Sequence, residues 1–286
     1  MEEKKLDLNS IIGFVLISGI LIWMLYSNAP TPEELKEKEK KEQVEKQAKE
    51  VKTVTSTVAA MPVADSTKKA AAQAQLGSFG YSATLPSATD AVTEIKNEVL
   101  SLKISNKGGY ITEATVLGFD QFEKNSKKAV QLIKDNNASL NIALNTTDNR
   151  TLNTKDMYFE PKLTTEGKNQ VLTLQLKAGP DQFLEYRYVL KPNEYMLDFA
   201  IRSQGLEKVV NTSKPLDLEW QLKSYRNEKS VSYENRYTEL VFEYEDGKDD
   251  YLNAAKDSED EANDVSYIAF KQHLFTSILL TDTKFK

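Results

Sequence analysis

The side chains best suited to chemistry are scarce in this sequence. The chain of 286 residues has one histidine, His273, and no cysteine. Without cysteine it has no disulfide framework, thiolate nucleophile or cysteine-based metal site. His273 lies in SYIAFKQHLFTSILL, between two apolar-rich strand candidates, and no partner for a catalytic triad or metal site stands beside it. We therefore expect a structural role for His273.

An acidic stretch at residues 246–264 is the second candidate for chemistry, since clustered carboxylates can bind Ca²⁺. The ligand order of an EF-hand fails here, because Phe242 takes the first loop position when Gly247 takes the sixth. The stretch also lacks apolar alternation, which favours an exposed acidic loop between strands. A carboxylate pair for glycoside hydrolysis stays open, because the spatial separation of carboxylates cannot be read from sequence.

Glycine-rich phosphate loops are missing from the sequence. Gly108 and Gly109 follow a strand candidate but precede another strand instead of a helix, which indicates a turn. The net charge of −6 comes without a basic patch, and this gives no support for nucleic-acid binding. We expect a protein that is not an enzyme, with no cofactor, metal or small-molecule substrate.

The elements that carry the chain begin with an uncharged run at residues 11–27, IIGFVLISGILIWMLYS. A helix of this length spans about 26 Å, close to the hydrocarbon thickness of a bilayer. A cleaved signal peptide is the alternative, but Pro30 after the small residues 27–29 and the interfacial aromatics favour a retained anchor. The expected membrane-contacting side chains are Ile11, Phe14, Leu16, Ile20, Trp23 and Tyr26.

No second apolar run is long enough to span a membrane, so one crossing is expected. The lysines on either side do not orient it, because Lys4 and Lys5 precede the run and more lysines follow it. A linker at residues 28–91 comes next. Its first part, 31–52, pairs Glu with Lys four residues later and predicts a solvated helical spacer. Its second part, 53–91, is rich in Ala, Ser and Thr and predicts a flexible tether.

From Val92 the apolar residues follow a period of two, typical of strands with one buried face. A hairpin is predicted where the turn 106–109 separates two such runs. Further alternating runs are Leu140, Ile142, Leu144; Leu172, Leu174, Leu176; Leu184, Tyr186, Tyr188, Leu190; Tyr195, Leu197, Phe199, Ile201; and Leu218, Trp220, Leu222. The pattern predicts a mostly β domain at residues 92–286, a large antiparallel sandwich.

Three stretches together resemble YidC-type membrane protein insertases of Gram-negative bacteria, members of the YidC/Oxa/Alb family. The opening through IIGFVLISGILIWMLYSNAPTPEE resembles their first transmembrane segment. NEVLSLKISNKGGYITEATV resembles the entry to their large periplasmic domain, and VSYIAFKQHLFT resembles a late motif of that domain.

The resemblance implies a cytoplasmic tail at residues 1–10, an inner-membrane anchor at 11–27 and a periplasmic domain folded as a β-supersandwich, similar to galactose mutarotase. It implies an insertase and chaperone role with integral membrane protein substrates, the lipid bilayer and Sec translocon components as partners. The family continues into five more transmembrane helices with a hydrophilic groove, and we expect the final strands of the domain to follow Lys286. No residue of that groove has a position here.

A second function class stays open, namely a membrane-tethered carbohydrate-binding or mutarotase-like module. It would use exposed aromatic residues such as Trp220, and sugar epimerisation would need a general acid and a general base. A scaffold that binds partners through an unidentified surface is compatible with either role.

Overall fold

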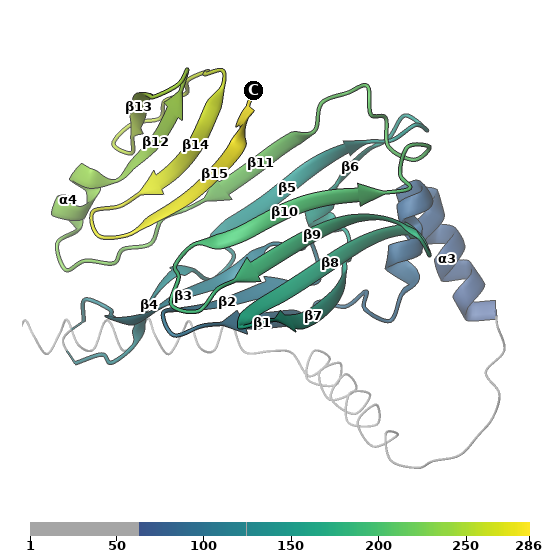
Figure 1. Ribbon diagram of the computed structural model, residues 1–286, viewed down its shortest axis with the longest axis horizontal. Coiled ribbons are helices and arrows are strands. Elements are labelled where there is room, and N and C mark those ends of the chain that lie inside the picture. The colour runs from purple at the N-terminus through teal and green to yellow at the C-terminus, as the bar shows by residue number, and fades with distance from the viewer. Residues whose placement is uncertain (1–62, 124) are drawn as a thin grey trace, which may run out of the picture. The chain divides into compact units, whose positions relative to one another are not determined.

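A computed structural model describes residues 63–123 and 125–286, and the predicted anchor and helical spacer lie outside them (Figure 1). The helices are α3 (Val63–Leu76), η1 (Gly77–Thr84), η2 (Thr154–Asp156), α4 (Val231–Glu234) and η3 (Asn235–Tyr237). The strands are β1 (Val92–Lys96), β2 (Leu100–Ser105), β3 (Ile111–Asp120), β4 (Ala129–Ile133), β5 (Ala138–Asn145), β6 (Thr151–Asn153), β7 (Glu160–Glu166), β8 (Asn169–Gly179), β9 (Gln182–Leu190), β10 (Leu197–Gln204), β11 (Asp217–Leu222), β12 (Glu239–Tyr244), β13 (Lys248–Asn253), β14 (Val265–Lys271) and β15 (Thr276–Phe285).

These strands form antiparallel sheets in which most neighbours in space are also neighbours in sequence. The strand orders are β1-β2-β3-β4, β10-β9-β8-β7, β11-β5-β6 and β13-β12-β14-β15. Such meanders need only short turns between strands. The predicted fold class, mostly β with antiparallel sheets and consistent with a sandwich, is confirmed.

The core lies between the sheets and follows the alternation read from the sequence. On β8 the side chains of Leu172, Leu174 and Leu176 are fully buried, and on β9 Tyr186 is fully buried. They join buried side chains of β2, β3 and β5 in one hydrophobic cluster. Burying each such side chain contributes about 1.5–3 kcal/mol, which makes this cluster the main source of stability.

The predicted hairpin is confirmed between β2 and β3, where Leu102 pairs with Ala114. Gly108 and Gly109 have φ angles of 80° and 68°, in the left-handed region that glycine adopts readily. At Gly109 a Cβ would lie 2.9 Å from a ring atom of Tyr186. The Tyr188 hydroxyl donates a hydrogen bond of 2.7 Å to the Gly109 carbonyl oxygen. The turn therefore packs onto β9 and needs glycine for space as well as for backbone conformation.

The predicted tether at 53–91 is wrong over most of its described part, because α3 and η1 together occupy residues 63–84. Phe79 is fully buried in the core. The Gly80 backbone approaches α3 so closely that a Cβ would meet Ala72 at 2.6 Å. Ser82 donates a hydrogen bond to the Tyr158 carbonyl oxygen. One buried aromatic side chain thus fixes a segment whose composition alone suggested disorder, and the folded domain begins before Val92.

The prediction of an acidic loop at 246–264 is wrong in its first part, because residues 248–253 form β13. Glu245, Asp246 and Gly247 have positive φ angles, and β13 then pairs with β12 in a hairpin. Most side chains of β13 are exposed, so its sequence shows no alternation between buried and solvent-facing residues. Residues 254–264 form the connection to β14.

Candidate functional site

The predicted anchor side chains, Ile11, Phe14, Leu16, Ile20, Trp23 and Tyr26, lie outside the described residues. Their role stays a prediction. Within residues 63–123 and 125–286 no helix combines the length and apolar character needed to cross a membrane.

His273 lies in the turn between β14 and β15, not on a strand, and its ring is built into a polar and aromatic cluster. Its Nδ1 is 2.7 Å from a carboxylate oxygen of Glu228. The rings of Tyr237 and Tyr233 lie 4.6 and 5.1 Å from the imidazole, centroid to centroid. These contacts join the 228–237 segment to the β14–β15 turn and agree with the structural role expected for His273.

Next to His273 in the chain, Gln272 contacts a buried carboxylate that has no cation partner among the described residues. Glu234 is 3% exposed, and it accepts hydrogen bonds from the Asn227 backbone N–H at 2.9 Å and from Gln272 Nε2 at 3.1 Å. Gln272 also donates to the Tyr225 carbonyl oxygen at 2.7 Å. Asn227 donates to Gln272 Oε1 at 3.0 Å. Sequence reasoning missed this network, because Gln272 is far along the chain from its partners.

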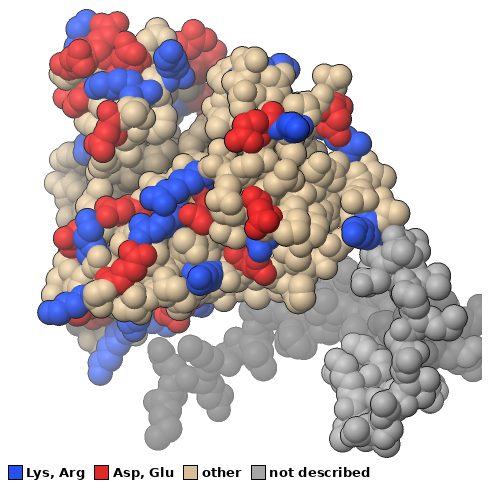
Figure 2. All heavy atoms as spheres, turned by 45° about the vertical axis from the view of Figure 1, so that its right-hand side comes forward, with Lys and Arg blue, Asp and Glu red and all other residues tan. Residues whose placement is uncertain are grey.

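The acidic residues near β13 do not assemble a metal site in the part of the chain that the structure describes. No group of three or more His, Asp or Glu side chains there could hold a metal ion. Asp246 is nearly fully exposed, and its closest cation is Lys284 at 3.5 Å. Figure 2 shows acidic side chains gathered at the upper left, where Figure 1 places the β12–β13 hairpin, with basic ones between them.

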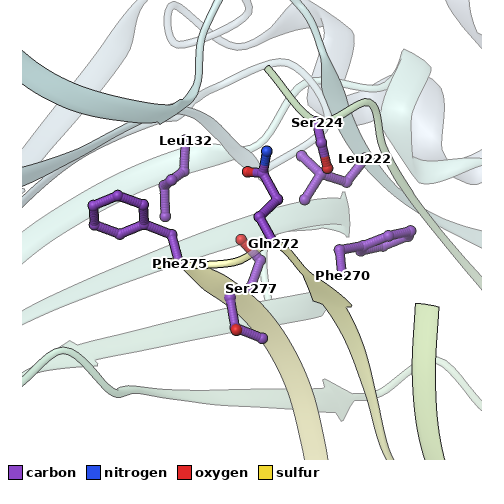
Figure 3. A pocket seen from close by; sticks show the side chains of 8 residues that line it. Leu132, Leu222, Ser224, Phe270, Gln272, Phe275 and Ser277 are labelled. Atoms are coloured by element: carbon purple, nitrogen blue, oxygen red, sulfur yellow. The ribbon is translucent and has the colours of Figure 1, made fainter. Parts of the chain in front are cut away.

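Trp220, the candidate for sugar stacking, is half-buried on β11. Its ring meets Phe270 of β14 edge to face, with centroids 4.7 Å apart. Trp220 therefore joins β11 to the β12–β15 sheet. The gap beside this junction is about 10 Å³, room for one water molecule. Figure 3 shows Gln272 and Ser277 between Leu132 and Phe275 on one side and Leu222 and Phe270 on the other.

A larger groove lies on the opposite face of the β12–β15 sheet. Cross-strand partners share a face, so Tyr251, Val241, Ala269 and Ile278 form one apolar row across all four strands. In the next row Tyr267 pairs with Leu280. We call the side chains of Val241, Tyr251, Tyr267, Ala269, Ile278 and Leu280 the outer face. Ile278 is 47% and Leu280 52% exposed, and the groove over them has a volume of about 300 Å³.

Polar groups border the outer face. Lys271 Nζ and a Glu239 carboxylate oxygen lie 2.7 Å apart at one side. At the other side the Tyr267 hydroxyl donates to Asp249 at 3.1 Å. Partial burial, followed by this hydrogen bond, raises the pKa of Tyr267. The ring therefore stays neutral at physiological pH and adds to an apolar strip with a polar border, an arrangement typical of surfaces that bind other molecules.

Comparison with known proteins identifies the domain that carries these features. The YidC periplasmic domain family matches residues 92–286, a range that contains every strand of the described residues. The chain belongs to this family. The resemblance read from the three sequence stretches is thereby confirmed.

Curated relatives match almost the whole chain. This chain is 29% identical over 285 residues to a protein of Porphyromonas gingivalis named "Membrane protein insertase YidC". The aligned region covers 98% of this chain and 44% of that protein. Proteins of the same name from Parabacteroides distasonis and Chlorobium luteolum are 30% and 26% identical, again over 98% of this chain. The chain spans less than half the length of these relatives.

Proposed function

We propose that this chain forms the N-terminal portion of a membrane protein insertase and chaperone, which helps integral membrane proteins insert and fold in the bacterial inner membrane. The observation that carries the proposal is the family match over residues 92–286, together with relatives named as insertases along 98% of the chain. The activity requires binding and no covalent chemistry. The insertion groove belongs to the part of the relatives that this chain does not cover.

In this proposal residues 11–27 form a single anchor helix with a cytoplasmic N-terminus, and residues 92–286 lie in the periplasm. The anchor keeps the domain near the site where apolar segments enter the bilayer. The insertase acts alone or with the Sec translocon. Support for the Sec partnership is the family resemblance alone, and co-purification of translocon subunits with the full-length insertase from solubilised membranes tests it.

The outer face is the described surface whose chemistry best fits an insertase substrate. An apolar segment of a membrane protein has no polar side chains to pair with a charged surface. The row formed by Tyr251, Val241, Ala269 and Ile278 offers such a segment apolar contacts without ion pairs. We assign this face to transient contact with apolar substrate segments.

A chimera tests the insertase proposal. Residues 1–286 replace the matching region of the Porphyromonas gingivalis relative, and the chimera is expressed in cells of that species depleted of their own insertase. We expect insertion of a reporter membrane protein to recover with the chimera but not with residues 1–286 alone. A stable chimera without activity, or full recovery with residues 1–286 alone, contradicts the proposal.

The anchor is tested separately, by membrane fractionation of residues 1–286 expressed alone. Leu16→Arg places a charge near the centre of the predicted span, which costs about 2.5–3.5 kcal/mol for insertion. We expect the variant to leave the membrane fraction. Ser27→Arg, at the end of the span, is the matched control, and we expect it to remain in the membrane. Equal membrane retention of both variants would show that residues 11–27 do not form the anchor.

A further inference from the structure

Exposed aromatic and aliphatic side chains gather at one end of the domain. The region comprises residues 223–237, which contain α4 and η3, and the turn 272–275 between β14 and β15, side by side in Figure 1. Leu274 is 65%, Val231 44% and Tyr233 43% exposed. We call these two segments the tip.

The two segments of the tip form one surface because their side chains interlock. Tyr233 and Tyr237 lie with centroids 5.3 Å apart, and both rings contact His273. The Ser230 hydroxyl accepts a hydrogen bond of 3.3 Å from the Tyr233 N–H at the start of α4. The exposed rings and Leu274 are thus held in place by the network around His273 and Glu234.

The tip is cationic although the chain as a whole carries a net charge of −6. In residues 223–237 the exposed charged side chains are Lys223, Arg226, Lys229 and Arg236. Among the described residues none of these cations forms an ion pair with a carboxylate. The only two carboxylates of the segment face inward, since Glu228 binds His273 and Glu234 is buried.

The β3–β4 connection extends this cationic region. The Arg226 guanidinium lies 4.1 Å from the centre of the Phe122 ring, so this connection contacts the tip directly. It adds the exposed cations Lys127 and Lys128 and the exposed carboxylate of Glu123, and Asp120 at the end of β3 adds a second exposed carboxylate. Over the combined surface the exposed cations outnumber the exposed carboxylates.

We propose that the tip docks on a membrane surface that contains anionic lipids. Tyrosine rings and single aliphatic side chains partition into the headgroup region, and Lys and Arg around them meet lipid phosphates. A lipid surface accepts such side chains without a shaped partner. An acidic protein segment is the competing occupant, but it offers Leu274 and Val231 no apolar environment of its own.

Docking of the tip goes beyond the proposed function. It rests on that function only through the membrane anchor, which raises the local concentration of the domain near the bilayer. It assigns the tip a second contact with the bilayer. With this contact the domain would have a preferred orientation on the membrane instead of moving freely at the end of its linker.

Site-specific fluorescence quenching tests the docking. The absence of cysteine lets one introduced cysteine carry the label. Ser232→Cys reports on α4, and Ser213→Cys reports on the exposed β10–β11 connection at the opposite end of the domain (Figure 1). The full chain is placed in nanodiscs of phosphatidylcholine, with or without phosphatidylglycerol, that carry a headgroup quencher. We expect quenching at position 232 in the anionic discs, its loss in high salt, and little quenching at position 213.

Charge variants distinguish docking through the tip from attraction between the whole domain and an anionic membrane. K223Q, K229Q and R236Q together should weaken docking about a hundredfold, since each cation near an anionic surface contributes about fivefold. The matched control is K162Q, K168Q and K208Q, which removes the same charge from exposed positions elsewhere and should leave quenching unchanged. Equal loss in both triple variants, or quenching that ignores lipid charge, overturns the proposal.

The remaining outcomes are also decisive. An unquenched position 232 that responds instead to added polyglutamate would assign the tip to an acidic protein and overturn lipid docking. Elution of the chain without discs would show that the predicted anchor fails. The labelled chain is then mixed with preformed discs, where position 232 must still be quenched if the tip binds lipid.

Discussion

The β7–β10 sheet and the β12–β15 sheet both alternate along their strands, but they distribute apolar side chains differently. On β8 and β9 the apolar residues gather on the covered face, and the other face carries pairs such as Arg187 with Glu166 at 2.7 Å. In the β12–β15 sheet one face packs through Phe270 onto Trp220, while the outer face also presents apolar side chains.

This difference separates side chains that are covered within the described residues from side chains that those residues leave about half exposed. The covered face of β8 and β9 loses stability with any change of volume, because interiors are close-packed. The outer face holds Ile278 and Leu280 about half exposed, so their removal costs the fold little. Substitutions in the two sheets should therefore have unequal effects.

The largest effect is expected in the shared core. Leu174→Ala removes a fully buried side chain of β8 and should lower the free energy of unfolding by about 2–5 kcal/mol. Urea unfolding of residues 63–286 measures it. If Leu174→Ala lowered the free energy of unfolding less than Leu280→Ala in the outer face, the two sheets would differ in the opposite sense to the one expected.

The β2–β3 turn should be nearly as sensitive. Gly109→Ala forces a left-handed φ on alanine and places its Cβ against the Tyr186 ring. We expect a loss of about 2–4 kcal/mol, from backbone strain and overpacking together. Gly167→Ala is the matched control, because its φ is also positive but no atom lies within 4 Å of the added Cβ. Equal melting temperatures for the two variants would refute the packing role of Gly109.

Alkaline pH should weaken the core through Tyr186. Burial raises the pKa of this phenol to about 12, above the value of about 10 that it has when exposed. Below pH 10 the phenol is neutral in both states and its contribution is fully present. Between pH 10 and 12 only the unfolded state ionises, so about 3 kcal/mol is lost in that window. Tyr186→Phe should make the free energy of unfolding less dependent on pH between pH 10 and 12. An unchanged slope would show that Tyr186 does not cause the loss.

The smallest effect on stability is expected at the outer face. Leu280→Ser should change the free energy of unfolding by no more than about 0.5 kcal/mol. Leu279, the next residue, faces the opposite side of β15 and is more covered. Leu279→Ser should therefore cost more than Leu280→Ser in paired urea titrations. The reverse order would mean that the outer face supports the fold.

Sequence predicts those parts of the fold in which local pattern and burial agree. The β2–β3 hairpin has its turn glycines at the expected place, and β8 and β9 show clear alternation. The segment around Phe79 was missed because one aromatic side chain outweighs a composition typical of linkers. Strand β13 was missed because an exposed edge strand has no buried side to create a period.

The candidate surfaces depend on contacts that no local pattern encodes. The network around Glu234 joins it to Gln272 across 38 positions. The alternation along β15 reveals two faces but not which of them the rest of the domain covers. The positive charge of the tip likewise depends on the inward direction of Glu228 and Glu234. That direction is visible only in the three-dimensional structure. The chemistry of the anchor run, by contrast, can be read from the sequence alone and stays a prediction.

Photo-crosslinking during insertion shows whether apolar substrate segments reach the outer face. A photoreactive amino acid replaces Ile278 on the outer face, or the exposed Lys168 on the β7–β8 turn, in the chimera during insertion of an arrested membrane protein. We expect crosslinks from position 278 to the apolar segment of the nascent chain and few from position 168. Equal yields from both positions, or none from position 278 while insertion proceeds, would contradict it.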